Sequence, residues 1–90
     1  MKTKILIKLS LIIDKMGIAD EIKRIDKPTN EEVGKELIML LITNLHKAEN
    51  EIYEFIATFK DITREEAEEL DVIPVFKELL KIEGMKDFLQ

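Results

Sequence analysis

The sequence contains no cysteine and no tryptophan, and its 90 residues include only one histidine, three glycines and two prolines. Without cysteine, the chain has no disulfide, no thiolate nucleophile and no sulfur ligand for a metal, which fits a reducing compartment such as the cytoplasm. Few glycines and prolines leave few sites for turns, and this predicts helices joined by short connections. We therefore expect one ordered, cytoplasmic domain over residues 1–90.

The residues that catalysis usually needs are also scarce. A metal site normally has three or four ligands, and His46 with Glu49 supplies only two. Ser10 lies within an apolar segment and has no nearby histidine and aspartate pattern to activate it. The three glycines stand too far apart to form a phosphate-binding loop. The sequence therefore predicts neither an enzyme nor a bound cofactor or metal.

A dense acidic run covers residues 65–69, where four of the five side chains are glutamates. On a helix, these carboxylates spread around most of the circumference, whereas a catalytic pair needs an enclosed pocket that raises one pKa. Glutamates near a helix N-terminus also complement its dipole. We interpret the run as a solvated helix face.

Positive charge is in deficit, because 14 Lys and Arg stand against 19 Asp and Glu, giving a net charge of −5. Such a charge repels nucleic-acid phosphates and anionic lipid headgroups, so neither is an expected partner. Residues 5–13 are largely apolar, but Lys8 interrupts them and no small-residue cleavage site follows. The run also falls short of the roughly 20 residues that span a bilayer, so neither secretion nor membrane insertion is expected.

Apolar residues recur at helical spacing through most of the chain. Within residues 4–16, a strand-like alternation is also present, but the length of the run favours a helix. The expected helices cover residues 4–16, 19–25, 30–45 and 48–59, a short acidic stretch after Thr63, and a last segment between Asp71 and Gly84. The predicted fold is therefore all-α, a compact single-domain bundle of about five to six helices.

Specific residues mark the predicted helix ends. Thr29 and Thr63 each precede a glutamate by three residues, which is capping-box spacing, and Asp71 is placed to cap the last helix. Gly17 is a candidate C-cap for the first helix. The helix over residues 30–45 is apolar around much of its circumference, so we expect it at the centre, with the helix over residues 48–59 packed against it.

Large apolar residues are concentrated near the C-terminal end: Phe76, Leu79, Leu80, Met85, Phe88 and Leu89. Two alternatives exist for them. They belong to the core, or some of them cover a partner or a second copy of the chain, since a small domain has a limited interior and exposed apolar patches mark interfaces.

Four stretches together resemble the tail assembly chaperones of long-tailed bacteriophages and prophages: residues 34–42, residues 46–57, the acidic helix of residues 63–70, and residues 75–80. The similarity is strongest at the end, where an Ile-Thr-x-Glu-Glu-Ala-Glu-x-Leu helix precedes an x-Phe-Lys-Glu-Leu-Leu helix and a terminal aromatic residue, Phe88. These are patterns of size and polarity and contain no catalytic residues.

The resemblance implies a helical protein that binds the tape measure protein, keeps it dissolved, helps to recruit tail tube subunits, and is absent from the finished virion. Self-association is also consistent with such a protein. As partner-binding residues we predict Phe76, Leu80, Met85, Phe88 and Leu89. An amphipathic client helix would lie against such an apolar surface.

A small helix-turn-helix transcriptional regulator is the alternative prediction. Residues 63–72 resemble the first helix and turn of that motif, although Asp71 takes the place of the usual turn glycine. The following helix offers only Lys77 and Lys81 to phosphates, and Glu78 opposes such contacts.

Overall fold

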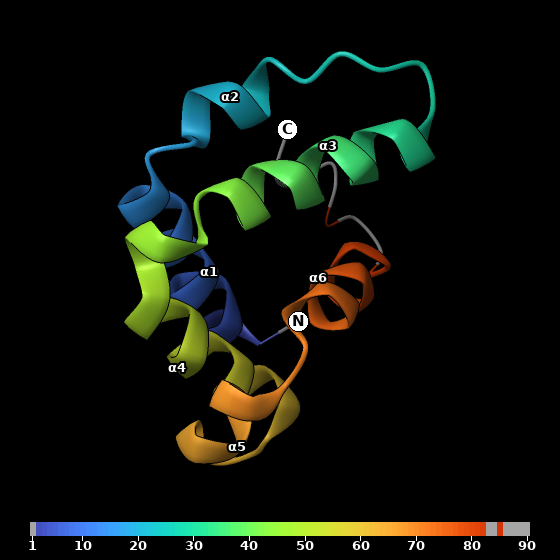
Figure 1. Cartoon of the computed structure of the whole chain (residues 1–90). Coiled ribbons are helices and arrows are strands. Elements are labelled where there is room, and N and C mark those ends of the chain that lie inside the picture. The colour runs from blue at the N-terminus through green and yellow to red at the C-terminus, as the bar shows by residue number, and fades with distance from the viewer. Residues whose placement is uncertain (1, 83–84, 86–90) are drawn as a thin grey trace.

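The computed structural model describes residues 2–82 and Met85, and this part of the chain contains helices and no strand (Figure 1). The predicted all-α class is confirmed. The elements are α1 (Thr3–Met16), α2 (Ala19–Lys23), α3 (Asn30–Thr43), the 3₁₀ helix η1 (Leu45–Ala48), α4 (Glu49–Lys60), α5 (Arg64–Glu69) and α6 (Val72–Leu80). In Figure 1, α2 and α3 form the upper end of the molecule and α5 the lower end.

Helix α1 shows why the first segment is a helix and not a strand. Its buried side chains recur every three or four residues: Ile5, Leu9, Ile12 and Met16. A strand would place Ile7 and Leu11 on the same face as Ile5 and Leu9, yet both are exposed. The helical period of the apolar residues therefore determines the structure here.

The predicted C-cap of α1 is confirmed at Gly17. Its φ is +68°, in the left-handed region, and its N–H donates to the carbonyls of Ile13 (3.0 Å) and Asp14 (3.1 Å). Glycine enters this region without the steric cost that a Cβ brings. The chain then turns into α2, which ends at Lys23, two residues before the predicted end.

Helix α3 begins as predicted, because the Thr29 hydroxyl accepts a hydrogen bond from the Glu32 N–H (3.2 Å). It ends two residues earlier than predicted. The Asn44 amide donates to the Leu40 carbonyl (2.8 Å) and the Thr43 hydroxyl to the Met39 carbonyl (2.9 Å). The Asn44 side chain thus satisfies the Leu40 carbonyl while the Asn44 N–H donates to the Leu41 carbonyl (3.3 Å), and the chain continues as η1.

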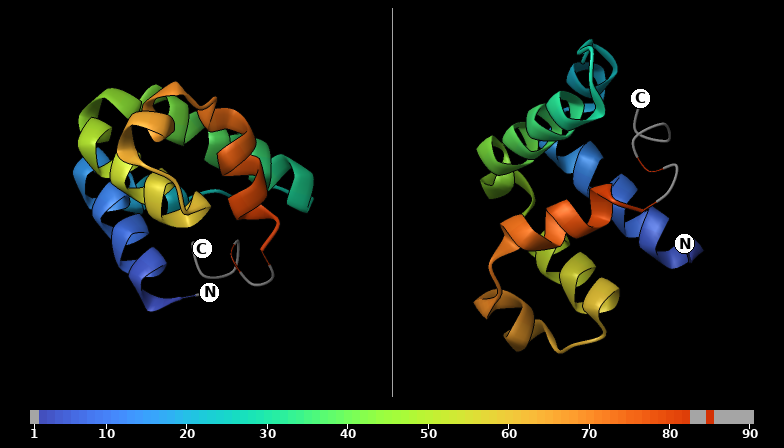
Figure 2. Two further views of the ribbon diagram at one scale, coloured as in Figure 1. Left: turned by 90° about the horizontal axis from the view of Figure 1, so that it is seen from below. Right: turned by 90° about the vertical axis from the view of Figure 1, so that its right-hand side faces the viewer.

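The prediction that residues 30–45 form the central helix is wrong. Helix α4 has the most central position, since it packs against both α1 and α5 and buries Ile52, Phe55 and Ile56. Helix α3 packs mainly against α6 and η1, and Met39 on its outer side is 59% exposed. The right-hand view in Figure 2 shows α3 in the upper part of the molecule and α5 at the lower end. A 90-residue chain has too few elements to cover α3 on every side.

Helices α5 and α6 begin at the predicted caps. Thr63 accepts from the Glu66 N–H (3.1 Å), and the Glu66 carboxylate accepts from the Thr63 N–H (3.0 Å), which completes a capping box. The Asp71 carboxylate accepts from the Ile73 N–H (3.1 Å). With only Leu70 and Asp71 between them, the two helices turn sharply and α6 passes back towards α3.

The core is apolar throughout the described part of the chain, where no polar or charged residue is buried. It receives side chains from every helix, including Ile22 from α2 and Ala67 from α5. Burial of these side chains is the main stabilising contribution to folding. Over the residues with assigned structure, no helix combines the length and hydrophobicity that crossing a bilayer requires.

Candidate functional site

The C-terminal apolar residues were the predicted partner-binding set. Phe76, Leu80 and Met85 are buried in the core, which is the first of the two alternatives for these residues. Helix α6 turns Phe76 and Leu80 inwards together with Val75 and Leu79. Of the remaining two predicted residues, Phe88 and Leu89, both lie outside the described residues. Phe76 and Met85 therefore present almost no surface to a partner in the folded chain, and Leu80 keeps only 7% of its surface accessible.

Other large apolar side chains are exposed instead: Ile7, Leu11, Met39, Leu70 and Ile73. Ile7 and Leu11 lie one turn apart on the outer face of α1 and are 57% and 51% exposed. We call this pair the α1 stripe. This exposed pair was not predicted from the sequence, because both residues lie in an apolar run. Their position on the helix face opposite the buried residues of α1 could have indicated it.

A hollow of about 370 Å³ adjoins the α1 stripe, between α1, α4 and the start of α5. Leu11 and Lys8 line one side, and Arg64 lines the other. The Arg64 guanidinium donates to the Asn50 side-chain oxygen (2.6 Å) and forms ion pairs with Glu54 (3.6 Å) and Glu68 (3.9 Å). These contacts fix one wall of the hollow beside an exposed apolar residue.

Tyr53 on α4 also contacts Arg64, whose guanidinium stands over its ring at 5.5 Å from the centroid. The Tyr53 hydroxyl donates to the Glu49 carboxylate (3.3 Å). Partial burial, followed by the negative charge of Glu49 and this hydrogen bond, raises the pKa of Tyr53 above its usual value. Tyr53 is thus a neutral hydrogen-bonded residue at neutral pH and not a nucleophile.

A second hollow, of about 320 Å³, lies between α3 and α6. Gly34, Ile38 and Leu80 form its apolar base. Its rim carries Glu31 and three lysines: Lys35, Lys77 and Lys81. We call it the lysine groove. It is lined by residues from two helices that are distant in sequence, including Leu80, one of the predicted partner-binding residues.

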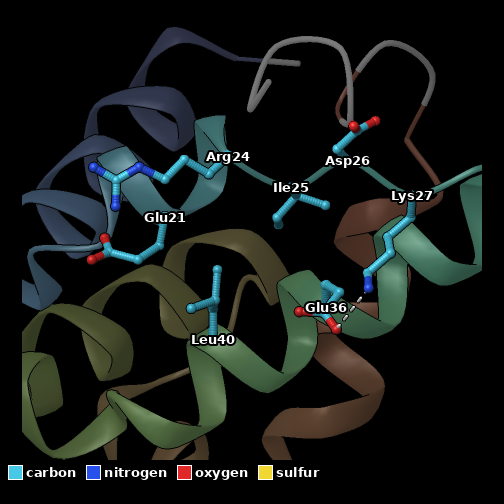
Figure 3. Close-up of a pocket in the computed structure, with 7 residues that line it drawn as sticks. All are labelled: Glu21, Arg24, Ile25, Asp26, Lys27, Glu36 and Leu40. Carbon is cyan, nitrogen blue, oxygen red and sulfur yellow. Dashed lines mark ion pairs between the residues drawn. The ribbon is translucent and has the colours of Figure 1, made fainter.

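A third hollow, of about 350 Å³, lies between α3 and the segment that follows α2 (Figure 3). Lys27 reaches towards Glu36 on α3, with 3.9 Å between the ammonium and the carboxylate, whereas Asp26 points the other way. Ile25 and Leu40 supply the apolar part of the lining. Charges of both signs alternate around it, so it has no clear preference for a charged ligand.

The residues considered for metal or acid-base chemistry do not come together. His46 is exposed in η1, and Ser10 is exposed on α1. Glu65 and Glu69 are exposed on α5, while Glu66 serves the capping box and Glu68 pairs with Arg64. Within the described ranges, no group of three histidine or carboxylate side chains is placed to hold a metal ion.

The segment considered as a helix-turn-helix consists of α5, two connecting residues and α6. A recognition helix contacts bases mainly through its N-terminal residues, and here these are Val72, Ile73 and Pro74. Lys77 and Lys81 follow one and two turns later and line the lysine groove.

Comparison of the chain with models of protein families, with curated proteins and with solved structures gave no match.

Proposed function

We propose that this chain is a tail assembly chaperone of a long-tailed phage or prophage. It binds the tape measure protein and tail tube subunits in the host cytoplasm during tail assembly, and it does not remain in the mature virion. The sequence resemblance over residues 34–80 supports the identity of the client. The exposed α1 stripe supports the existence of a client that covers it.

The α1 stripe is the observation that carries the proposal. Ile7 and Leu11 stay more than half exposed although the chain buries the other face of α1 completely. Covering both with a client helix contributes on the order of 2 kcal/mol, at about 25 cal/mol per Å² of apolar surface. Two side chains at this spacing match the one-turn repeat of an amphipathic helix laid against them.

The charge of the molecule supports the same role. A net charge of −5 on a 90-residue chain opposes aggregation, so the complex with an apolar client remains dissolved. Lys8 beside the stripe provides a cation that can pair with a carboxylate on a client.

Co-expression with the tape measure protein of the same phage or prophage tests the proposal. We expect the wild-type chain to increase the soluble fraction of the tape measure protein and to co-purify with it. If the tape measure protein stays insoluble and no complex forms, the proposed function is wrong.

A pair of matched variants tests the part played by the α1 stripe. Ile7→Ser with Leu11→Ser removes the exposed apolar pair and should abolish the solubilising effect, because neither side chain supports the core. Met39→Ser with Ile73→Ser removes a similar exposed apolar area elsewhere and should leave the effect intact. Circular dichroism spectra should show that both variants remain folded.

The predicted roles of Phe88 and Leu89 are tested in the same assay. Phe88→Ser with Leu89→Ser should reduce recovery of the tape measure protein if these residues contact the client. Recovery equal to that of the wild type would exclude them from the client surface.

The alternative function, a small helix-turn-helix regulator, is favoured by the short connection between α5 and α6 and by exposed Lys77 and Lys81. It makes a different prediction: binding of duplex DNA that weakens steeply as salt is raised. Electrophoretic mobility shifts at two salt concentrations distinguish it from the chaperone.

A further inference from the structure

The lysine groove carries positive charge that the described residues do not neutralise. Glu31 forms an ion pair with Lys35 at 3.6 Å, but both side chains are largely exposed, so the pair is weak. Among the residues that the structure describes, no carboxylate lies within ion-pair distance of Lys77 or Lys81. Glu78, between them in sequence, pairs instead with Lys60 at 2.7 Å.

The helix dipole explains only part of this arrangement. Lys77 and Lys81 lie at the C-terminal end of α6, where cations interact favourably with the last carbonyls. Lys35, in contrast, lies in the first half of α3 and gains nothing from the end of that helix. Packing of α3 against α6 brings three lysine side chains to one groove on a molecule whose net charge is −5.

The base of the groove adds an apolar requirement. Ile38 is partly exposed, Leu80 keeps 7% of its surface accessible, and Gly34 presents no side chain. A ligand that fits must therefore place an apolar group on Ile38 and Leu80 and negative charges beside the lysines. Nucleic acid meets the second condition only, and Glu31 on the rim opposes its phosphates.

We infer that the lysine groove binds an amphipathic helix whose apolar side chains are flanked by glutamate or aspartate. Leucine-sized side chains of that helix contact Ile38 and Leu80, and its carboxylates pair with Lys77 and Lys81. The inference rests on the proposed function for the source of this helix, which is a client protein. It adds a second contact surface, on the side formed by α3 and α6.

Titration with designed peptides tests the inference without any tape measure protein. One alanine-based peptide carries leucines at helical spacing flanked by glutamates, and a matched peptide carries lysines in place of those glutamates. Methyl signals of Ile38 and Leu80 in NMR spectra report occupation of the groove. We expect the acidic peptide to shift these signals and to bind at least about tenfold more tightly than the basic one.

Charge-reversal variants distinguish the effect of the groove lysines on peptide affinity from the effect of the net charge of the chain. Lys77→Glu with Lys81→Glu should weaken binding of the acidic peptide about tenfold or more. The control, Lys15→Glu with Lys23→Glu, makes the same change in net charge, also near helix C-termini, and should stay within about twofold of the wild type. Equal affinity for the two peptides, or equal loss in both variants, would overturn the inference, as would shifts confined to residues outside the groove.

The two proposals fail in different ways. If the wild-type chain and the Lys77→Glu, Lys81→Glu chain solubilise the tape measure protein equally well, the chaperone function stands and the groove does not bind the client. If the peptide results are as expected but the wild-type chain does not solubilise the tape measure protein, the proposed function is wrong and the groove serves another acidic helix. Tighter binding of duplex DNA than of the acidic peptide would also overturn the groove inference.

Discussion

In the part of the chain that the structure describes, two residues end helices in the left-handed backbone region, and they illustrate how a single side chain affects stability. Gly17, after α1, has φ +68°, and Asp61, after α4, has φ +56°. A Cβ atom costs about 1 kcal/mol or more in this conformation, and aspartate tolerates it better than alanine does. Gly17 is therefore the most favourable residue for its site, whereas glycine would suit the site of Asp61 better than aspartate does.

We therefore expect opposite effects from substitutions at the two sites. Gly17→Ala should lower the free energy of unfolding by about 1 kcal/mol, because nothing lies within 4 Å of the added methyl group and only the backbone is strained. Asp61→Gly should raise it by a few tenths to about 1 kcal/mol. Urea unfolding of both variants is the measurement, and a Gly17→Ala chain as stable as the wild type would contradict the prediction.

Tyr53 is the only tyrosine, so its ionisation can be followed directly by absorbance. Because partial burial and Glu49 raise its pKa, its titration midpoint should lie above the usual value of about 10. The unfolded chain then loses this proton first, so stability should fall as pH rises from about 10 towards the folded pKa. Glu49→Gln should lower the midpoint, whereas Glu51→Gln serves as a control and should not.

At the level of the elements, the sequence predicted where helices start better than where they end. The side-chain oxygens of Thr29, Thr63 and Asp71 each accept a hydrogen bond from a backbone N–H two or three residues later, so their effect is local and visible in the sequence. The ends of α2 and α3 came two residues early. For α3, the end depends on competition by Thr43 and Asn44 for carbonyls, which spacing alone did not indicate.

The two halves of the α5 capping box can be tested separately. Thr63→Ala removes the hydroxyl that accepts from the Glu66 N–H and should destabilise the protein by about 1 kcal/mol, as should Thr29→Ala at the start of α3. Glu66→Ala removes the carboxylate that accepts from the Thr63 N–H, a bond that Thr63→Ala leaves in place, and should also destabilise the protein. Thermal unfolding followed by circular dichroism compares the three variants, and a Glu66→Ala chain as stable as the wild type would show that the reciprocal bond is not important.

At the scale of the whole molecule, the arrangement of helices and the candidate surfaces were the least predictable features. An apolar helix face shows that something covers it, but it does not show which helix does, and this is why α3 was wrongly placed at the centre. The lysine groove joins Lys35 with Lys77 and Lys81 only after α6 has packed on α3. The α1 stripe, by contrast, could have been found by separating the two faces of one helix.

The central position of α4 predicts where substitutions are most damaging. Phe55 is fully buried and stacks on Phe59 with 5.5 Å between ring centroids, so Phe55→Ala should cost about 3–5 kcal/mol. Met39→Ala on the outer side of α3 should change stability by less than about 0.5 kcal/mol. If Phe55→Ala does not fold, Phe55→Leu provides a milder test. A greater loss from Met39→Ala would contradict the assignment of the centre.

A core with no buried polar or charged group in the described part of the chain has a consequence for evolution. In a protein core, the two members of a hydrogen-bonded pair must be substituted together, whereas one aliphatic residue can be substituted by another when the total volume of the core is kept. Selection on the interior then acts on size and shape rather than on particular residues. Proteins descended from a common ancestor with this one are therefore expected to preserve the course of the backbone long after few of their amino acids still coincide.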